Sequence, residues 1–209
     1  MTNPNKSNSL RRSSVVPIEN YASNALMAAD FHFNKVNSII SECEDKWKNF
    51  EDKDKAQTLQ NSMLQQEIGW YIRAFFWELH SVFDLISHWA NERFALGFVG
   101  KDIRWKDISE CKRTSNQPIV WNLVKETITK KRSEQLFFEI VHYRNFAHEG
   151  TPTIQIITDS ITDTWHVFMP VAVEGQTQYI DIREQLPKYI LFTKESGRDI
   201  FLHNAISNK

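Results

Sequence analysis

The segment from Ile68 to Trp89 would carry apolar side chains around more than half of the circumference of a helix. A helix that is apolar nearly all round is buried among neighbouring elements. We therefore predict that this segment forms a buried helix of an antiparallel helical bundle. The helix is expected to extend from Ala56 to about Leu96 and to end before Gly97, because glycine favours helix termination.

Two further long helices are expected to pack against it. Apolar residues recur at three- and four-residue steps from Glu19 to about Phe50, and again from Pro118 to near Gly150. Proline suits the first turn of a helix because its missing N–H has no partner there. We interpret Pro118 to Gly150 as one continuous helix, and we predict a last helix from Leu186 to Ala205.

A small antiparallel β-insert, at about residues 153–182, is predicted before the last helix. The segments 153–158, 164–171 and 178–182 are rich in β-branched and aromatic side chains, which is typical of strands. Turn-forming residues separate these segments. The predicted fold class is therefore mainly α, with a small β-insert.

The N-terminal composition and the cysteine content indicate the domain organisation and the location. Residues 1–17 are rich in Asn and Ser and are predicted to be a disordered tail, which leaves residues 18–209 as a single domain. No apolar run approaches the roughly 18 residues of a membrane helix, and the tail lacks the apolar region of a secretory signal. The two cysteines form no CxxC pair. We therefore expect a cytoplasmic protein with no membrane partner.

The net charge of −1 conceals a basic central segment. Residues 101–148 contain 10 Lys and Arg against 6 Asp and Glu, a net charge of +4. This excess can attract phosphates, but a solvated helix face is the simpler interpretation. The excess is too mild to indicate nucleic-acid binding by itself. The chain has no P-loop and no dinucleotide-binding motif, so no cofactor is expected.

The segment from His142 to Gly150, at the end of the third predicted helix, is the most informative one for function. Arg144 and His148 are four residues apart, which places them about 40° apart around a helix, so that both can meet one phosphate. Arginine offers a planar fork of donors to phosphate oxygens, and histidine exchanges protons near neutral pH. Asn145 can orient the phosphate or the imidazole. These residue types are suited to metal-independent cleavage of a phosphodiester.

Arg144, Asn145 and His148 resemble the motif of the HEPN superfamily, the "higher eukaryotes and prokaryotes nucleotide-binding" domain. In that motif an Arg, usually followed by a polar residue, precedes a His by four to six intervening positions. The segment 76–84 also resembles the partner helix of bacterial members, and the resemblance covers about residues 21–150. It implies a metal-independent endoribonuclease of a bacterial toxin–antitoxin or phage-defence system. The implied partners are RNA, a second copy in a homodimer, and an antitoxin or another protein.

The chain departs from the motif in one respect, because only three residues separate Arg144 from His148. The shorter spacing leaves open a non-catalytic member of the superfamily, a module that binds RNA or a nucleotide. His142 is an alternative proton carrier, although it precedes the arginine.

A second group of polar residues lies in the segment that is expected to be buried. His80, Asp84 and His88 follow one another at four-residue steps, so they form one stripe on a helix. The stripe can ligate a transition metal, and Glu139 and His142 can add ligands, which would give a metal-binding bundle. The sequence has one Glu-x-x-His pair where a di-iron bundle has two, so we expect no metal. Asp84 or Glu78 is expected instead to hold Arg144 or a histidine by a hydrogen bond.

The tryptophans of the basic segment are a further candidate feature. Trp105 lies between Arg104 and Lys106, and Trp121 follows in the third predicted helix. Both are candidates for stacking on RNA bases, although aromatic residues at helical spacing are more often part of the core.

Overall fold

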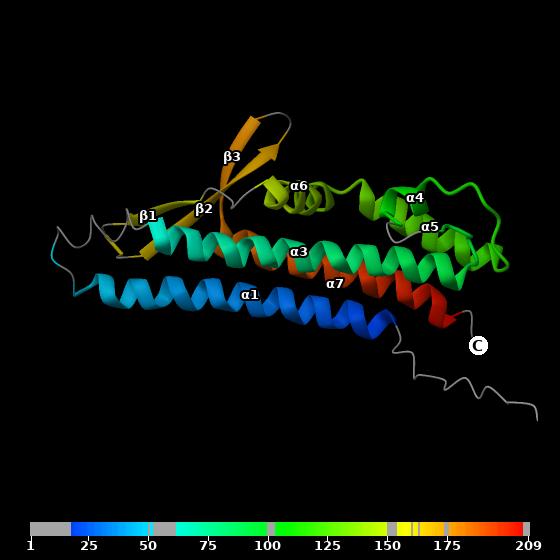
Figure 1. Cartoon of the computed structure of the whole chain (residues 1–209), viewed down its shortest axis with the longest axis horizontal. Coiled ribbons are helices and arrows are strands. Elements are labelled where there is room, and N and C mark those ends of the chain that lie inside the picture. Colours follow the sequence, from blue (N-terminus) through cyan, green and yellow to red (C-terminus); the bar gives the residue numbers. More distant parts are fainter. Residues whose placement is uncertain are drawn as a thin grey trace, which may run out of the picture.

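Three long helices form the body of the molecule. A computed structural model describes residues 18–49, 51, 62–99, 103–149, 154–159, 161–162, 164–173 and 176–206, and the predicted tail, residues 1–17, lies outside these ranges. Helices α1 (Ile18–Trp47), α3 (Ser62–Arg93) and α7 (Ile182–Ile206) run along the longest axis, with α1 antiparallel to α3 (Figure 1). Together with the small sheet before α7, they confirm the predicted mainly α fold class.

Helix α3 is the buried helix that its apolar composition predicts. It packs against α1, α6 and α7, and its inward side chains are almost wholly removed from solvent: Ile68, Ile72, Phe75, Phe76, Leu79, Val82, Phe83 and Ile86. None of the helices in the described ranges combines the length and the apolar composition of a membrane-spanning segment.

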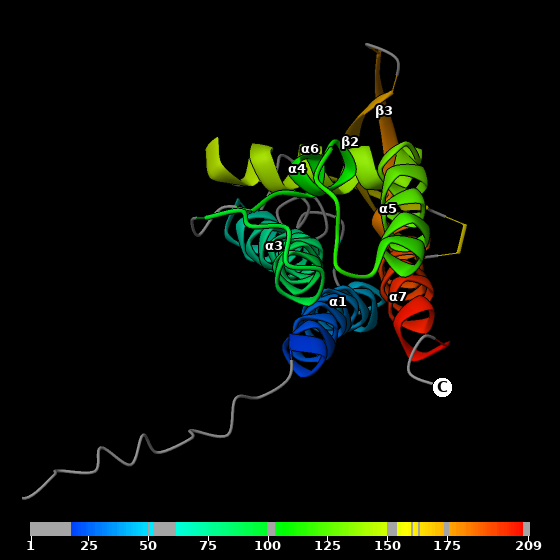
Figure 2. The same cartoon turned by 90° about the vertical axis from the view of Figure 1, so that its right-hand side faces the viewer.

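Three shorter helices cover one side of this body. They are α4 (Trp105–Ser109), α5 (Pro118–Arg132) and α6 (Gln135–Glu149). Viewed along the long axis, α5 lies above α7, and α4 and α6 lie above α3 (Figure 2). The space that these helices enclose with α3 is the candidate site described below.

The helix predicted from Pro118 to Gly150 is wrong as one continuous element, because the chain breaks it into α5 and α6. The last turn of α5 tightens: the N–H groups of Ser133 and Glu134 donate to carbonyls three residues back, and the Ser133 hydroxyl bonds the Lys130 carbonyl at 2.6 Å. The two helices then pack on different partners, α5 on α4 and α7, and α6 chiefly on α3. Hydrophobic periodicity continues across the break, so it does not reveal the change of direction.

The β-insert is an antiparallel sheet of strands β1 (Gln155–Asp159), β2 (Thr164–Val173) and β3 (Gln176–Asp181), in the order β1-β2-β3. Gln155 pairs with Phe168, and Phe168 pairs with Asp181 on its other side. Alternate residues of β2 point into the core, so Trp165, Val167 and Met169 are fully buried. The alternation is that of a half-buried strand, and it confirms the predicted insert.

An ion pair ties α1, β2 and α7 together. The carboxylate of Glu44 accepts hydrogen bonds from both terminal nitrogens of Arg183, at 2.8 and 3.0 Å, and from the backbone N–H of Trp165 at 2.9 Å. Trp165 packs edge-on against Trp47, with ring centroids 5.5 Å apart. Burial opposes ionisation of Glu44, but these hydrogen bonds outweigh it and lower the pKa of the carboxyl group.

Candidate functional site

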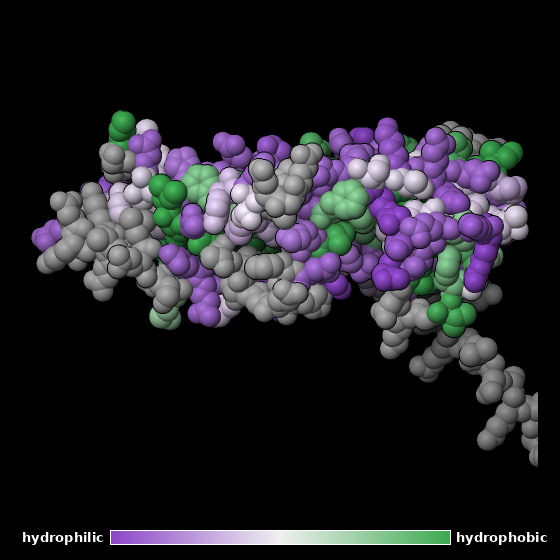
Figure 3. Space-filling view, turned by 90° about the horizontal axis from the view of Figure 1, so that it is seen from above, coloured by the Kyte–Doolittle hydropathy of each residue, from purple (hydrophilic) through white to green (hydrophobic). Residues whose placement is uncertain are grey.

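A cleft of about 960 Å³ opens between α3, α4, α5 and α6. Its floor and walls include apolar side chains, among them Phe83, Trp105 and Phe137. Its polar lining comes from four different helices and the residue before α4: His80, Asp84, Arg104, Lys106, Arg132, Arg144 and Asn145. Seen from above, the side of the molecule that carries α4–α6 is mostly hydrophilic, with a few apolar patches (Figure 3).

Arg144 and Asn145 reach the cleft because the residue before them anchors α6 in the core. Tyr143 is buried, stacks on Phe76 with ring centroids 4.6 Å apart, and donates its hydroxyl to the carbonyl of Pro170 on β2. Arg144 and Asn145 follow on the adjoining side of the helix and line the cleft. The structure therefore brings together two of the three residues that the motif predicts.

The third residue of the motif, His148, belongs to the same helix. Helix α6 is continuous to Glu149, so the backbone of His148 follows that of Arg144 by about 6 Å along the axis. The side chain of His148 lies outside the described part of the structure.

Among the described side chains, the guanidinium of Arg144 has two neighbours. Its Nη1 donates to Oδ1 of Asn145 at 3.2 Å, and the group lies over the ring of Trp77 on α3, 5.3 Å from the centroid. Both contacts leave N–H donors of the fork for another acceptor, because a guanidinium has five. Arg144 is therefore positioned but can still bind an anion.

His80 and Asp84 form the second polar pair of the cleft. Nδ1 of His80 lies 3.1 Å from Oδ2 of Asp84, and the side chains are 17% and 41% exposed. A carboxylate only accepts hydrogen bonds, so Nδ1 donates in this contact and Nε2 is the ring nitrogen that the contact with Asp84 does not use. An imidazole held in this way is suited to exchanging a proton with a ligand. The predicted role of Asp84 in holding a histidine thus has a matching geometry.

Two of the predicted supporting residues do not line the cleft. Glu78 acts electrostatically on His32 of α1: burial lowers the pKa of His32, and the negative charge of Glu78 partly offsets that effect. His142 is exposed, with its ring 5.7 Å from that of Tyr143.

The residues proposed as metal ligands are also separated. Glu139 is buried and accepts hydrogen bonds from Tyr189 at 2.7 Å and from Gln135 at 3.0 Å. In the described ranges, no three His, Cys, Asp or Glu side chains gather closely enough to hold one metal ion. His80, Asp84 and His88 therefore share a helix stripe, but the described part of the chain does not gather them into a metal centre.

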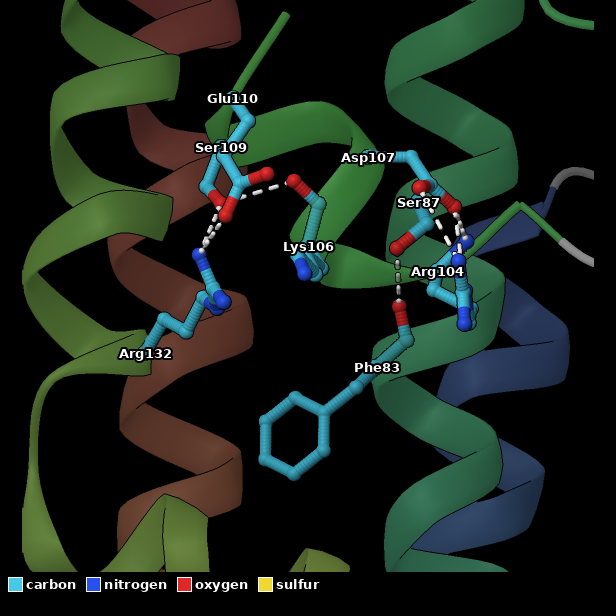
Figure 4. Close-up of polar contacts among 8 residues, drawn as sticks. All are labelled: Phe83, Ser87, Arg104, Lys106, Asp107, Ser109, Glu110 and Arg132. Carbon is cyan, nitrogen blue, oxygen red and sulfur yellow. Dashed lines mark hydrogen bonds and ion pairs between the residues drawn. The ribbon is translucent and has the colours of Figure 1, made fainter.

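Three basic residues of the cleft were not identified as site residues from the sequence. Arg132 donates from the end of α5 to the hydroxyl of Ser109 at 3.0 Å and to Glu110 at 2.9 Å. Arg104, which is 70% exposed, pairs with Asp107 across 3.3 Å. Lys106 lies between these two arginines in the view of Figure 4, and it also lines the cleft. The basic excess of residues 101–148 is the sequence signal for them, and all three side chains line the cleft.

The two tryptophans predicted to stack on bases are buried instead. Trp105 and Trp121 are each 3% exposed, and Trp105 packs against the rings of Phe83 and Phe137, with centroids 4.4 and 5.0 Å away. The prediction is wrong because tertiary packing turns both indoles inward. The exposed tryptophan nearest the cleft is Trp77, beneath Arg144.

Comparisons of the chain with family models, with curated proteins and with solved structures found no match. The cleft and the motif are therefore the two features of the chain that bear on its function.

Proposed function

We propose that this protein binds RNA in the cleft and cleaves it as a metal-independent endoribonuclease of HEPN type. The observation that supports the proposal is the convergence of four cations on one cleft that also holds Asn145 and the His80–Asp84 pair. The lining of the cleft contains a single carboxylate, that of Asp84. The four cations that line it are Arg104, Lys106, Arg132 and Arg144. Phosphate contacts of this kind supply most of the affinity for a nucleic acid.

The carboxylates beside the arginines do not prevent phosphate binding. Asp107 and Glu110 each pair with one arginine of the cleft, and Glu110 is 55% exposed. Exposed ion pairs contribute only about 0–1 kcal/mol, so an arginine can exchange its carboxylate for a phosphate at small cost. The pairs hold the side chains near the cleft until a ligand arrives.

The chemistry that these groups support is transesterification. A base removes the proton of a ribose 2′-hydroxyl, the 2′-oxygen attacks the adjacent phosphorus, and the bond to the 5′-oxygen breaks as that oxygen receives a proton. The products are a 2′,3′-cyclic phosphate and a 5′-hydroxyl. Arg144 would stabilise the developing charge on phosphorus, and Asn145 would orient the phosphate. The resemblance assigns the proton transfers to His148, and the geometry of His80 adds a second candidate.

The test is incubation of the purified protein with labelled RNA in the presence of EDTA. Arg144→Ala and His148→Ala are each expected to abolish cleavage with the helical circular dichroism unchanged, and Arg144→Lys controls for the loss of charge. Full activity in both alanine variants would refute the mechanism. Activity that requires a divalent metal ion would refute the metal-independent assignment.

The short spacing between Arg144 and His148 favours a second candidate, a non-catalytic module that binds RNA or a nucleotide. It predicts binding that Arg144→Ala weakens, with no cleavage under any condition. The resemblance adds the further proposals of a homodimer, a cytoplasmic location, a toxin–antitoxin or phage-defence setting and an antitoxin or other protein partner.

A further inference from the structure

Phe138 on α6 is the most exposed apolar side chain in the lining of the cleft. It is 55% exposed, whereas the neighbouring Phe137 is 7% exposed and the rings of Phe83 and Trp105 are at most 3% exposed. The three buried rings belong to the hydrophobic core of the protein. Phe138 is not part of that core, so its ring is available to a ligand of the cleft.

The ring of Phe138 is open to a planar ligand. Among the described side chains, its one ring contact is with Phe137, edge to face, with centroids 6.3 Å apart and an interplanar angle of 71°. An edge-to-face contact occupies one face of a ring at most. The cation–π contacts of the described side chains involve other rings. At least one face of the Phe138 ring can therefore receive a base.

Two groups of cations share the cleft with Phe138. Asn145 follows Phe138 by seven residues, so both lie on one side of α6, about 10.5 Å apart along its axis, and Arg144 lies beside Asn145. On the α4 side, Phe137 packs against Trp105 with centroids 5.0 Å apart, and the basic residues before and after Trp105 line the cleft. A phosphate bound by Arg144 and Asn145 is therefore about two helical turns from the Phe138 ring, on the side of α6 that faces the cleft.

We propose that Phe138 stacks on the base of a nucleotide close to the phosphate that Arg144 binds, and that the cleft therefore prefers a purine at that position. This inference rests on the proposed function and adds a specificity-determining residue to it. Cations that contact the backbone carry no sequence information. Phenylalanine offers a base no hydrogen bond, so the preference comes from the stacked area, which is larger for the fused rings of a purine.

The charge around Phe138 favours a nucleotide over an apolar partner surface. An apolar surface laid on the ring would take nearby cations of the cleft out of water without pairing them, which costs free energy. A nucleotide brings a phosphate together with its base, so it pairs the cations and covers the ring at once.

The test measures kcat/KM in EDTA for two labelled RNA strands of roughly 12 nucleotides, one of uridine alone and one with a single central adenosine. If the chain binds without cleaving, the dissociation constants of the same strands are compared instead. The wild-type chain is expected to prefer the adenosine strand and to cut it at one position fixed relative to the adenosine. Phe138→Ala is expected to lower kcat/KM for that strand by roughly 5- to 150-fold, the equivalent of about 1–3 kcal/mol for one stacked base. The values for the two strands should then become nearly equal.

Further variants separate the ring from the apolar bulk. Phe138→Leu lacks a ring and should behave as Phe138→Ala does, whereas Phe138→Tyr keeps the ring and should retain the preference. Phe31→Ala removes a 54% exposed phenylalanine from α1, outside the lining of the cleft, and is the matched control. Circular dichroism checks that each variant keeps its helices.

Three outcomes would overturn the inference in distinguishable ways. If Phe138→Ala keeps the wild-type values for both strands while Arg144→Ala loses activity, stacking on Phe138 is refuted and the proposed function stands. If the wild type neither binds nor cleaves either strand, the proposed function fails together with this inference. If Phe138→Ala lowers both values equally and converts a dimer to a monomer in sedimentation, the ring is a contact between copies of the chain.

Discussion

Nδ1 of His80 lies 3.1 Å from Oδ2 of Asp84, one helical turn further along α3. If this imidazole transfers a proton, His80→Ala is expected to slow RNA cleavage by about 10²- to 10⁴-fold, with RNA affinity nearly unchanged. Single-turnover cleavage, measured beside anisotropy binding, separates the two effects. His88→Ala, on the same helix but not among the residues that line the cleft, is the control. Wild-type cleavage by His80→Ala would leave His148 and His142 as the predicted proton carriers, and His142 is not among the residues that line the cleft.

Asp84→Asn is expected to have a smaller effect of the same kind, because the amide no longer fixes the tautomer of His80 as a carboxylate does. A shift in the pH dependence of the cleavage rate is the readout, since a purely structural role would not move it.

The charge of the cleft should appear in the salt dependence of binding. Removing one cation that contacts a phosphate lowers the slope of log affinity against log salt concentration by about 0.7 for a single strand. Lys106→Ala is expected to show this decrease because Lys106 lines the cleft. Lys194→Ala removes an exposed lysine of α7 and should leave the slope unchanged. Equal slopes for Lys106→Ala and the wild type would exclude Lys106 from the RNA contacts.

The ion pair between Glu44 and Arg183 should make the fold sensitive to acid. Burial of Glu44 is outweighed by the hydrogen bonds that it accepts from Arg183 and Trp165, so its pKa is lowered on folding. A lowered carboxyl pKa contributes stability above the unfolded value of about 4.5, and this contribution is lost as the pH falls through the folded value. Glu44→Gln is expected to cost about 2–3 kcal/mol at pH 7, less than a fully buried pair. Urea unfolding at pH 7 and pH 3 measures both effects.

The control for that pair is Arg198→Ala. Arg198 is 62% exposed and pairs with Asp199, so its loss should change the free energy of unfolding by less than about 1 kcal/mol. If Glu44→Gln and Arg198→Ala lower the free energy of unfolding equally, the Glu44–Arg183 pair stabilises the fold no more than an exposed ion pair does.

Tyr189 should give a stability contribution that is lost in alkali. It is fully buried and donates its hydroxyl to Glu139 at 2.7 Å. Burial raises the pKa of Tyr189, and the bond to Glu139 raises it further. The unfolded chain therefore loses this proton first, and stability falls above about pH 10 by up to 1.4 kcal/mol per pH unit. Tyr189→Phe is expected to reduce that slope in alkaline urea titrations, whereas Tyr179→Phe, which removes the hydroxyl of a 51% exposed tyrosine, should not.

The turn after α3 offers two substitutions with opposite expected signs. Gly97 has a φ of 70° and Ala95 a φ of 51°, in the left-handed region that favours glycine. A Cβ on Gly97 would lie 3.2 Å from Nη1 of Arg113, so Gly97→Ala is expected to destabilise the protein by about 1–2 kcal/mol. Ala95→Gly relieves strain and should be neutral or stabilising by up to about 1 kcal/mol. Thermal unfolding of both variants tests the pair, and a destabilised Ala95→Gly would contradict it.

Much of the fold could be predicted because its elements carry local signals. The apolar circumference of Ile68–Trp89 predicts a buried helix, and the β-branched segments predict the insert. The break at Ser133–Glu134 could not be predicted, since the apolar periodicity continues through it and only the change of packing partner requires it.

The candidate site was predictable only in part. Arg144, Asn145 and the His80–Asp84 pair follow from motif and spacing, because each set lies within one helix. Arg132 could not be identified in this way, since it lies on a different helix, α5, and belongs to no helical repeat with the other site residues. Trp105 is buried and Trp77 is exposed, so the residue type alone does not predict which tryptophan reaches solvent.

The sequence by itself determined which segments become helices and strands, because periodicity, proline, glycine and β-branching act over a few neighbouring residues. It also determined the motif at the end of α6. Only the tertiary structure decided that Arg104, Arg132 and Arg144, from three separate elements, meet in one cleft. The physical reason is that burial is a property of the whole packed core, so the packing of α5 and α6 on different partners sets where their charged side chains point.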